Sequence, residues 1–574
     1  MDYKKEYKKW LESSVLDEAS KEELLNIKDD EEEKEYRFSK LMDFGTAGLR
    51  GIMGAGINMM NVYTIKHTTY SLGKVILDLG DDAKSKGVVI SFDPRNHSRE
   101  FALTAALTLC ALGIRTYLFD DIRPTPELSF AIRELKAISG INITASHNTK
   151  EYNGYKVYWE DGAQMPPDMA DKVHENMKDL DILSDIDTMD KDIALSKGLL
   201  NIIGENIDNA YVERVLNESE YEKYTRKYCD DFKLVYTPFH GCGYKLVPLV
   251  LRKIGLKNLI LVESQMVLDG DFPTVKSPNP ENAEGFCEAI KTAKKNHADL
   301  IIGTDPDCDR VGVMAKNKNG EYETITGNQV GALILDYIIK AKKEKGEFEE
   351  NFAVTKSIVT TNIVDEICKK NNVKLYDVLT GFKFVGKKIK EIEQENKYKF
   401  IYGFEESIGY LKGSYARDKD GVVTSMIIAE MACYYLDKGM DLFDALEVIY
   451  KEYGYYDELT ESVYMQGLDG AQRMKETGER LREGPPYDFA GTKVVKVRDY
   501  LNHSVKDLTT GEVTKLDEVS SDVLFYELED GCDVIYRPSG TEPKVKLYIL
   551  SKGKDMKEAK EKSKKYIKAI KALI

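Results

Sequence analysis

The chain has 574 residues, of which 42% are hydrophobic and 31% are charged, a composition typical of a globular protein large enough for several domains. Its formal net charge of -16 at pH 7 opposes binding to nucleic acid and to anionic membranes. We therefore expect no nucleic-acid partner and no membrane partner, and we expect an anionic substrate to need a locally cationic site.

The eight cysteines are scattered along the chain, and no two of them form a C-x-x-C pair. This pattern argues against a disulfide framework and a structural zinc site, and it predicts a reducing, cytoplasmic location. The first residues lead into a charged helical pattern and not into an apolar signal core. No apolar run is long enough to span a bilayer.

The N-terminal segment is predicted to be helical before a glycine-rich stretch begins. Apolar spacing predicts an amphipathic helix over residues 3–16, and the acidic run 29–33 is predicted to be a solvated helix face or a linker. The stretch 44–56 has neither a Walker lysine nor the spacing of a dinucleotide-binding loop. Its glycines indicate either turns or backbone that approaches another group closely, and Arg50 is a candidate for bidentate phosphate binding.

Strands and helices then alternate in three successive segments. The predicted strands are 87–92, 137–143, 233–237, 299–303, 352–355 and 398–402, and helices are predicted over 101–112 and 245–254. Such alternation is typical of α/β domains, in which ligand-binding loops follow the carboxyl ends of strands. We predict three similar α/β domains, at residues 1–208, 209–324 and 325–462.

The C-terminal segment has a different pattern. Three strands that follow one another directly are predicted at 522–529, 532–536 and 544–549, and apolar spacing predicts a final amphipathic helix. This pattern predicts a smaller α+β domain at residues 463–574.

A serine follows one of the apolar strands, in the stretch Thr144-Ala145-Ser146-His147-Asn148. A serine at that position can be aimed outward at a substrate, and His147 and Lys156 lie close in sequence as proton carriers or phosphate partners. A polar turn is the alternative interpretation. Three further polar loops favour a functional site, because each suits one part of a phosphorylated substrate.

Three alternating aspartates, Asp305, Asp307 and Asp309, follow another apolar strand and can converge on one hard cation. The spacing excludes an EF-hand, because Arg310 stands where that loop needs glycine and Lys316 stands where it needs glutamate. Three carboxylates that leave room for a substrate oxygen suit Mg²⁺. The alternative is a solvated acidic turn.

The stretch 403–409 follows the last strand of the third segment. Its Glu405 and Ser407 could hydrogen-bond the vicinal hydroxyls of a sugar, although two polar residues in a loop are common. Arg417 and Lys419 follow as candidate cationic partners.

The stretch 537–543 lies between two predicted strands of the last domain. It combines an arginine, two hydroxyls and glycine-exposed backbone, contributed by Arg537, Ser539, Gly540 and Thr541. Such a set can form an anion nest for phosphate. A proline-rich connection is the alternative.

Five motifs together resemble one family. FGTAGLRG, TASHN with NGYKVY, DPDCDR, GFEESIGY and RPSGTEP occur in this order and are similar to the α-D-phosphohexomutases, most closely their phosphoglucomutase branch. The resemblance covers nearly the whole chain and implies three similar α/β domains and a smaller fourth around a central cleft. It implies a phosphorylated sugar substrate, Mg²⁺, and glucose 1,6-bisphosphate as activator and intermediate between glucose 1-phosphate and glucose 6-phosphate.

The resemblance also implies roles for the reacting residues. Ser146 resembles the family's phosphoserine, which ligates Mg²⁺ together with residues similar to Asp305, Asp307 and Asp309. Groups near the transferring phosphate are matched by Arg50, Lys156 and Arg310, and His147 is similar to the family's histidine beside the serine. Either Lys156 or His147 could take the proton of the attacking hydroxyl. Thr149 departs from the family, in which many members have proline after the SHN sequence.

For the substrate, Glu405 and Ser407 resemble the family's sugar-hydroxyl ligands, with Thr380 nearby. Lys419 resembles a lysine that faces the substrate. The phosphate that is not reacting would be held by Arg537, Ser539, Gly540 and Thr541.

The alternative hypotheses are enzymes with the same chemistry on another sugar: a phosphomannomutase, a phosphopentomutase or a sugar bisphosphate synthase. The pair of Glu405 and Ser407 resembles the glucose-type loop. A metal-dependent phosphatase would have no need of a second phosphate clamp, and a non-catalytic sugar-phosphate sensor would have no need of the complete set of catalytic residue types. The oligomeric state is not predicted.

Overall fold

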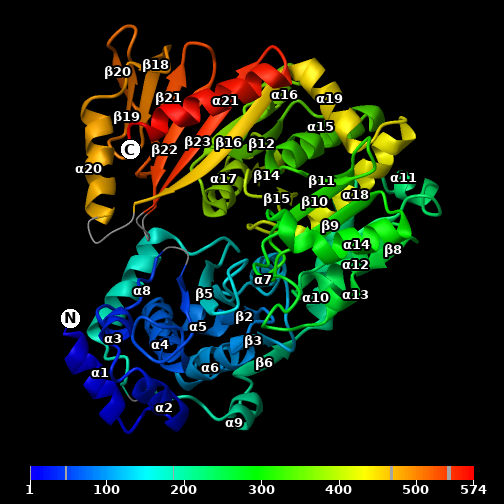
Figure 1. The fold of residues 1–574 in the computed structure, drawn as a ribbon. Coiled ribbons are helices and arrows are strands. Elements are labelled where there is room, and N and C mark those ends of the chain that lie inside the picture. Colours follow the sequence, from blue (N-terminus) through cyan, green and yellow to red (C-terminus); the bar gives the residue numbers. More distant parts are fainter. Residues whose placement is uncertain (1, 46–47, 185, 466–469, 540–543) are drawn as a thin grey trace.

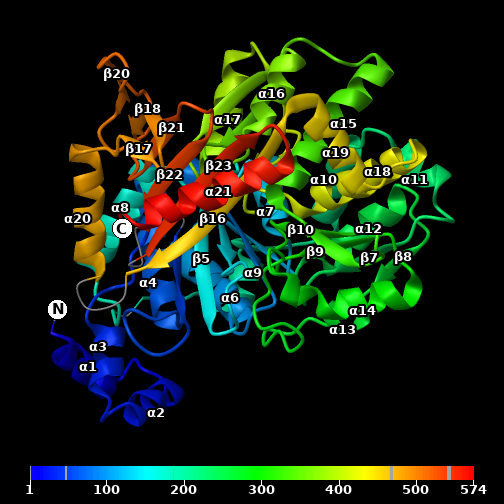
Figure 2. The ribbon, with the colours of Figure 1, turned by 45° about the horizontal axis from the view of Figure 1, so that its top comes forward.

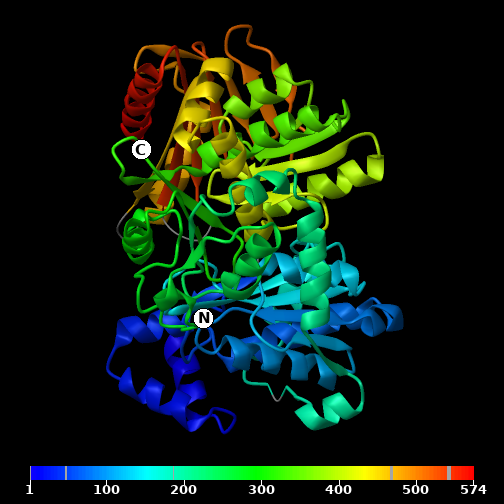
Figure 3. The ribbon, with the colours of Figure 1, turned by 90° about the vertical axis from the view of Figure 1, so that its right-hand side faces the viewer.

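The computed structural model describes residues 2–45, 48–184, 186–465, 470–539 and 544–574. Its four sheets belong to four domains, which follow one another along the chain in Figure 1. In the side view of Figure 3 the first domain lies at the bottom and the fourth at the top, with the second between them. The predicted fold class, three similar α/β domains followed by a smaller α+β domain, is confirmed.

The first domain has a sheet in the order β1-β5-β4-β2-β3-β6. Its strands are β1 (Leu49–Ile52), β2 (Val88–Phe92), β3 (Thr116–Phe119), β4 (Ser139–Ile143), β5 (Tyr152–Trp159) and β6 (Leu200–Ile203). Its helices are α1 (Tyr3–Glu12), α2 (Glu18–Asn26), α3 (Glu31–Phe38), α4 (Val62–Asp78), α5 (Asp81–Lys86), α6 (Ser98–Ala111), α7 (Thr125–Glu134), α8 (Pro167–Asp179) and α9 (Lys191–Ser196).

The N-terminal helices differ from the prediction. The first helix ends at Glu12 and not at residue 16. The acidic run begins α3 as an exposed helix face, which is one of its two predicted interpretations, and the N-cap Asp30 accepts from the backbone N–H of Glu33. Acidic residues are favourable there because they interact with the helix dipole. Trp10, Leu24 and other apolar residues form a separate small core against the first domain.

The second domain has the sheet order β11-β10-β9-β7-β8. Its strands are β7 (Leu234–Thr237), β8 (Leu259–Leu261), β9 (Leu300–Thr304), β10 (Val311–Lys316) and β11 (Tyr322–Ile325). Its helices are α10 (Glu205–Asn217), α11 (Glu222–Lys227), α12 (Gly243–Lys253), α13 (Glu263–Met266), α14 (Cys287–Asn296) and the 3₁₀ turn η1 (Ala283–Phe286).

The third domain has the sheet order β13-β12-β14-β15. Its strands are β12 (Phe352–Ser357), β13 (Lys374–Val378), β14 (Lys399–Glu405) and β15 (Gly409–Lys412). Its helices are α15 (Gly327–Lys345), α16 (Ile363–Lys370), α17 (Phe382–Glu395), α18 (Gly421–Asp437) and α19 (Leu442–Tyr453). Apolar side chains of all three α/β domains form one continuous core.

The fourth domain has an antiparallel sheet in the order β16-β23-β22-β21-β18-β19-β20. Its strands are β16 (Tyr455–Tyr464), β17 (Asp488–Phe489), β18 (Thr492–Asp499), β19 (Ser504–Asp507), β20 (Val513–Lys515), β21 (Leu524–Leu528), β22 (Asp533–Pro538) and β23 (Lys544–Gly553). In Figure 2, α20 (Gly470–Glu483) and α21 (Met556–Lys571) lie along this sheet. Its other face packs on the third domain through apolar residues such as Val359, Leu379, Ile535 and Tyr548.

The predicted domain boundary at 462 falls inside β16. That strand pairs over its whole length with β23, about eighty residues later, and therefore belongs to the fourth sheet. We propose a boundary between α19 and β16. The other predicted boundaries, at 208 and 324, fall inside α10 and β11.

The first three sheets repeat one arrangement that positions the site. In each, a central parallel strand is followed by an antiparallel partner: β4 by β5, β9 by β10, and β14 by β15. The connecting loops therefore occupy equivalent positions in the three domains. They carry Ser146, the three aspartates and Ser407, respectively.

Among the residues that the structure describes, no helix combines the length and the apolar character that crossing a membrane requires.

Candidate active site

Each of the three equivalent loops contains one non-glycine residue with left-handed backbone. The φ angles are 52° at Ser146, 55° at Cys308 and 54° at Ile408. Such a conformation costs free energy in residues other than glycine, and it persists only where the surroundings impose it. Backbone strain is thus placed at the same point of all three domains, beside the polar side chains predicted to act.

Ser146 lies where the first and second domains meet. It is 3% exposed, and its Oγ donates a hydrogen bond to Oδ2 of Asp305 at 2.8 Å. The same Oγ is 3.2 Å from Nδ1 of His147. The predicted nucleophile and the predicted metal loop, 159 residues apart, are therefore in direct contact.

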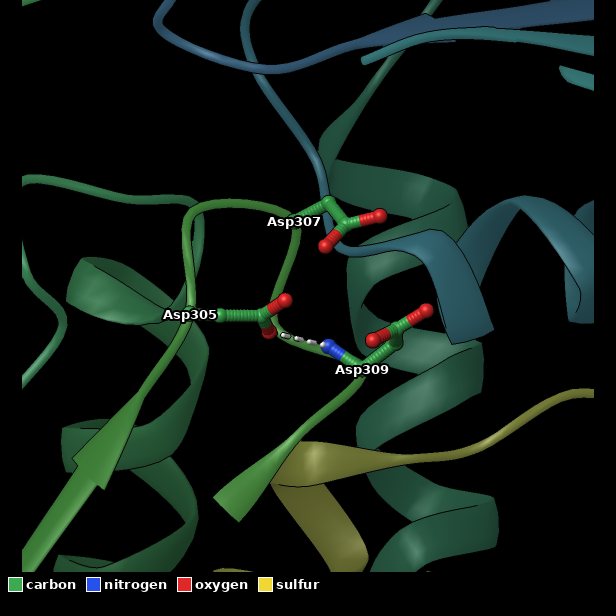
Figure 4. Close-up of side chains that lie close together, drawn as sticks. All are labelled: Asp305, Asp307 and Asp309. Carbon is green, nitrogen blue, oxygen red and sulfur yellow. Dashed lines mark hydrogen bonds between the residues drawn. The ribbon is translucent and has the colours of Figure 1, made fainter. Parts of the chain in front are cut away.

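The three aspartates converge as predicted (Figure 4). All are buried, and one oxygen from each lies within 4.8 Å of the others. Oδ1 of Asp305 accepts from the backbone N–H groups of Asp309 and Arg310, at 3.1 and 3.0 Å, which curls the loop. Within the described part of the chain, Oδ1 of Asp307 and Oδ1 of Asp309 are buried without a hydrogen-bond partner.

This donor set fits a hard divalent cation. Buried carboxylate oxygens without partners are costly, and a cation bound by oxygen ligands removes that cost. Burial and the charges of Asp307 and Asp309 raise the pKa of Asp305 well above its usual range. The acidic loop could therefore hold a metal such as Mg²⁺.

Two lysines border the acidic loop. Nζ of Lys156 lies 2.7 Å from Oδ2 of Asp307, and Nζ of Lys419 lies 3.1 Å from Oδ2 of Asp309. Burial opposes ionisation of these groups, but the ion pairs prevail. They raise the pKa of Lys156 and lower that of Asp307. Lys419 is also 3.0 Å from Oδ1 of Asp418, so it stands beside the acidic loop.

A cleft of about 730 Å³ opens between the domains. Residues from all four domains line it, and they include His147, Glu281, Arg310, Thr380, Glu405, Glu406, Ser407, Arg537, Lys546 and Tyr548. Six of these were predicted as site residues from the sequence. The four domains thus enclose a central cleft, as the resemblance implied.

The third domain contributes Glu405 and Thr380 to the cleft. Glu405 ends β14, and its Oε1 accepts from the backbone N–H of Gly381 at 2.6 Å. Burial raises the pKa of Glu405. Oγ1 of Thr380 is buried without a hydrogen-bond partner among the described residues, so it is available to a ligand.

His147 and Arg310 both line the cleft. Burial and the charges of Arg310 and Arg50 hold the pKa of His147 well below its usual range, which favours the neutral imidazole. Nη1 of Arg310 donates to the backbone oxygen of Ser407 at 3.2 Å, so this arginine spans the second and third domains.

Comparison with known proteins identifies the family. Three domain signatures match the chain: phosphoglucomutase/phosphomannomutase α/β/α domain I at residues 41–182, domain II at 209–320 and domain III at 326–453. Phosphoglucomutase of Staphylococcus aureus (strain MRSA252) is 35% identical over 533 residues, which are 92% of this chain and 93% of the relative. The chain belongs to the phosphoglucomutase/phosphomannomutase family.

Solved structures share the fold. A putative phosphomannomutase from Thermus thermophilus has a TM-score of 0.67 at 20% identity, covering 93% of this chain and 99% of that one. The open form of the Paramecium phosphoglucomutase parafusin has a TM-score of 0.67 at 17% identity, covering 92% and 93%. The family resemblance drawn from the five motifs is confirmed by the three domain signatures and by the Staphylococcus aureus relative. The third match ends at 453, just before β16.

Other predicted residues of this phosphohexomutase lie outside the cleft lining. Arg50 is exposed on β1, which pairs with β5, and its Nη1 donates to Oδ1 of Asn148 at 3.1 Å. Arg417 faces away, because it is bound to Glu393 and to the backbone oxygen of Ser414. Arg417 is thus not the cationic partner that the sequence suggested.

The predicted anion nest is described only in part. Nη1 of Arg537 is 3.5 Å from the hydroxyl of Tyr548, and the backbone N–H of Ser539 donates to the backbone oxygen of Lys544 at 2.8 Å. Gly540 and Thr541 lie outside the described residues, so their roles remain predictions.

Sequence reasoning missed two residues that support the reacting loops of this phosphohexomutase. Thr125 donates from Oγ1 to Oδ2 of Asp307 and from its backbone N–H to the Asp307 carbonyl, both at 2.9 Å. Arg95 donates to backbone oxygens of the Ser146 loop. Arg95 follows β2 and Thr125 follows β3, and a position after a buried strand was the available signal.

Proposed function

We propose that this phosphohexomutase interconverts glucose 1-phosphate and glucose 6-phosphate, with Ser146 as the residue that carries the phosphate. One observation carries the proposal: Oγ of Ser146 lies 2.8 Å from Asp305 of the acidic loop, next to a cleft lined by all four domains. A candidate nucleophile, a candidate cation site and a cavity of about 730 Å³ therefore adjoin one another. The Staphylococcus aureus relative is named a phosphoglucomutase.

Asp305, Asp307 and Asp309, with Oγ of Ser146, would hold Mg²⁺, which supplies positive charge that stabilises the transferring phosphoryl group. Arg310 adds a second positive charge at the cleft wall, and Arg50 reaches the Ser146 loop through Asn148. Phosphoryl transfer depends mainly on positioning and charge stabilisation, and these residues provide both.

The reaction would consist of two transfers at Ser146. A free hydroxyl of glucose 1-phosphate attacks the phosphate on Ser146, the bond from phosphorus to Oγ breaks, and glucose 1,6-bisphosphate forms. The bisphosphate then reorients within the cleft. Oγ attacks its other phosphate, and glucose 6-phosphate is released. Glucose 1,6-bisphosphate added from outside would load a resting enzyme in the same way, which makes it the activator.

One side chain must take the proton of the attacking hydroxyl. His147 lines the cleft and lies 3.2 Å from Oγ of Ser146, whereas Nζ of Lys156 is engaged by Asp307. This geometry favours His147, and Lys156 remains the second candidate. Loss of the base should lower kcat and remove one limb of the pH profile, which distinguishes the two residues.

The opposite wall would hold the rest of the substrate. Glu405, Ser407 and Thr380 face the cleft and present acceptors and hydroxyls to the sugar. Arg537, with Ser539, Gly540 and Thr541, would bind the phosphate that is not reacting. Because either phosphate must fit in turn, a set of general anion donors suits this wall better than a closely shaped pocket. Lys419, whose Nζ lies 3.1 Å from Oδ2 of Asp309, would face the substrate from beside the acidic loop.

Related activities give distinguishable results. A phosphomannomutase, a phosphopentomutase or a bisphosphate synthase would rank its own sugar first when kcat/KM is compared across sugar phosphates. A phosphatase would release inorganic phosphate steadily from the same substrates. We also propose a cytoplasmic location, because the scattered cysteines predict a reducing environment.

The proposal is tested by a coupled assay for glucose 6-phosphate. Wild type and Ser146→Ala are incubated with glucose 1-phosphate, Mg²⁺ and a trace of glucose 1,6-bisphosphate. We expect turnover only in wild type. If the folded, metal-loaded wild type shows no activity, glucose 1-phosphate is not the substrate. If both proteins are equally active, Ser146 is not the phosphate carrier.

A further inference from the structure

The buried ion pair of Asp93 and Arg95 is linked to both backbone polar groups of Ser146. Arg95 bonds the backbone oxygen directly, and Asp93 reaches the N–H through Thr144. Oδ2 of Asp93 accepts from Oγ1 of Thr144 at 2.7 Å, and that same Oγ1 accepts the backbone N–H of Ser146 at 2.8 Å. On the other side, Nη2 of Arg95 donates to the backbone oxygen of Ser146 at 2.6 Å. Asp93 and Arg95 are themselves paired, with Nε 3.1 Å from Oδ2.

The guanidinium of Arg95 is fully used. Its five donated hydrogen bonds go to Asp93 and to the backbone oxygens of Ser146, Asn148, Thr149 and Tyr152. Five N–H donors are all that a guanidinium has. Because four of them bind one loop in a planar fork, Arg95 determines the path of the chain on both sides of Ser146.

The second domain covers this pair. Cζ of Arg95 lies 5.0 Å from the ring centroid of Phe272, and the side chain of Arg95 is fully buried. Gly270 comes so close to the first domain that a Cβ there would stand 2.5 Å from the backbone nitrogen of Asn96. The guanidinium is thus shielded from water, which strengthens its hydrogen bonds.

The arrangement matters because Ser146 adopts a left-handed backbone, with φ of 52°. A serine leaves that region unless its neighbours impose it. In this conformation Oγ points at Asp305, 2.8 Å away. Phosphate on Oγ would add negative charge beside three carboxylates, so the loop must also resist being pushed away.

We propose that Asp93 and Arg95 are positioning residues for phosphoryl transfer: by holding Ser146 on both sides, they keep Oγ aimed at the acidic loop. The inference rests on the proposed function of Ser146 as the phosphate carrier. Neither residue lines the cleft, so their loss should slow the transfer step and leave sugar binding largely intact.

The main test is Arg95→Lys, which keeps the charge but replaces the planar fork of five donors by a single ammonium group with three. Displacing a reacting group by about 1 Å can cost on the order of a hundredfold in rate. We expect kcat to fall by that order while KM for glucose 1-phosphate stays within about threefold of wild type. Single-turnover phosphorylation of Ser146 by glucose 1,6-bisphosphate should slow in parallel.

The matched control is Arg99→Lys, at the start of the helix α6 that follows Arg95. The Arg99 side chain is 65% exposed, and it donates to Asp121 and to the backbone oxygen of Asp120, away from the Ser146 loop. Its kcat and its KM should equal those of wild type.

A second pair of variants removes the link on the Asp93 side without touching Arg95. Thr144→Val keeps the shape but loses the hydroxyl, whereas Thr144→Ser keeps the hydroxyl. We expect kcat to fall in the valine variant and to recover in the serine variant. The thermal unfolding midpoint of the valine variant should also fall, because Asp93 and the backbone N–H of Ser146 each lose a buried hydrogen bond, so kcat is compared at a temperature where both variants are folded. This pair decides the matter if Arg95→Lys does not fold.

Three outcomes would overturn the inference. A kcat of Arg95→Lys equal to wild type would do so, and so would a loss confined to KM. If the Arg95 variant does not fold, equal kcat values for Thr144→Val and Thr144→Ser would overturn it. A wild type that places no phosphate on Ser146 would instead overturn the proposed function, and this inference with it.

Discussion

The two sides of the cleft are built differently. On the side of the first and second domains, Ser146, Asp305 and Asp307 are buried, and each has a short hydrogen bond or ion pair to a neighbouring side chain. The oxygens without a partner on that side, among the described residues, include Oδ1 of Asp307 and Oδ1 of Asp309, which belong to the candidate metal site. On the side of the third and fourth domains, Oγ1 of Thr380 and Oε1 of Glu458 are, within the described chain, buried without a hydrogen-bond partner. On the first side, hydrogen bonds and ion pairs fix the side chains that we propose react. On the second side, polar groups are free to bind a ligand.

This difference fits the chemistry proposed for the chain. The transferring phosphate must meet Ser146 in one geometry, because phosphoryl transfer depends on alignment. The sugar and its other phosphate must be accepted in two orientations. Substitutions on the first side should therefore affect kcat, whereas substitutions on the second side should affect KM.

The largest effect is expected for Ser146→Ala. Removing the hydroxyl removes the phosphate carrier, and kcat should fall by at least about ten-thousandfold. Binding of glucose 1-phosphate, measured by calorimetry, should stay near the wild-type value, because Ser146 does not line the cleft. Lost binding together with lost turnover would remove the distinction between the two sides.

Asp307→Asn should have the next largest effect. The variant keeps the shape but removes a charge from the acidic loop, where Asp307 also pairs with Lys156 at 2.7 Å. We expect metal affinity to fall by about ten- to a hundredfold and kcat to fall at limiting metal. Mn²⁺ binding followed by electron paramagnetic resonance measures the affinity directly. Unchanged Mn²⁺ binding would mean that the three aspartates do not form the metal site.

Arg537→Ala should mainly raise KM. The side chain lines the cleft from β22, opposite Lys546 on β23, and we propose that it binds the phosphate that is not reacting. Loss of one charge-assisted contact should raise KM by about tenfold and change kcat by less than about threefold. Steady-state kinetics decide this, and a loss confined to kcat would place Arg537 at the reaction centre.

The smallest effect is a pH dependence from Glu406. This side chain lines the cleft, and burial together with the charge of Glu405 raises its pKa to about 7. Below that pKa Glu406 is neutral, and above it a negative charge faces an anionic substrate. KM should therefore rise by about threefold as pH increases through the pKa, and Glu406→Gln should remove that rise. Parallel KM profiles for the two proteins would contradict this role.

Much of the fold was predictable because its central strands are apolar and continuous in sequence. Ile141 and Ile143 in β4, and Ile301 and Ile302 in β9, are almost fully buried, and polar loops follow both strands. That local pattern located Ser146 and the three aspartates. Equivalent strand ends in a repeated sheet then bring such loops together without further information.

The parts that were missed depend on contacts between distant segments. The strand β1 is four residues long and is recognisable only through its pairing with β5, about a hundred residues later. Likewise, the predicted boundary at 462 falls inside β16, because the pairing of that strand with the distant β23 is not visible in the local pattern. Arg95 and Thr125 act on backbone and carboxylate groups of other loops, and their neighbours in sequence do not reveal those partners.

The most direct test of the central claim is to follow the phosphate on Ser146 by mass spectrometry of the intact protein and its peptides. Incubation with glucose 1,6-bisphosphate should place one phosphate on Ser146, and addition of glucose 1-phosphate should then yield glucose 6-phosphate without release of inorganic phosphate. A phosphate that is found on another residue, or that leaves Ser146 only as inorganic phosphate, would contradict the mutase mechanism.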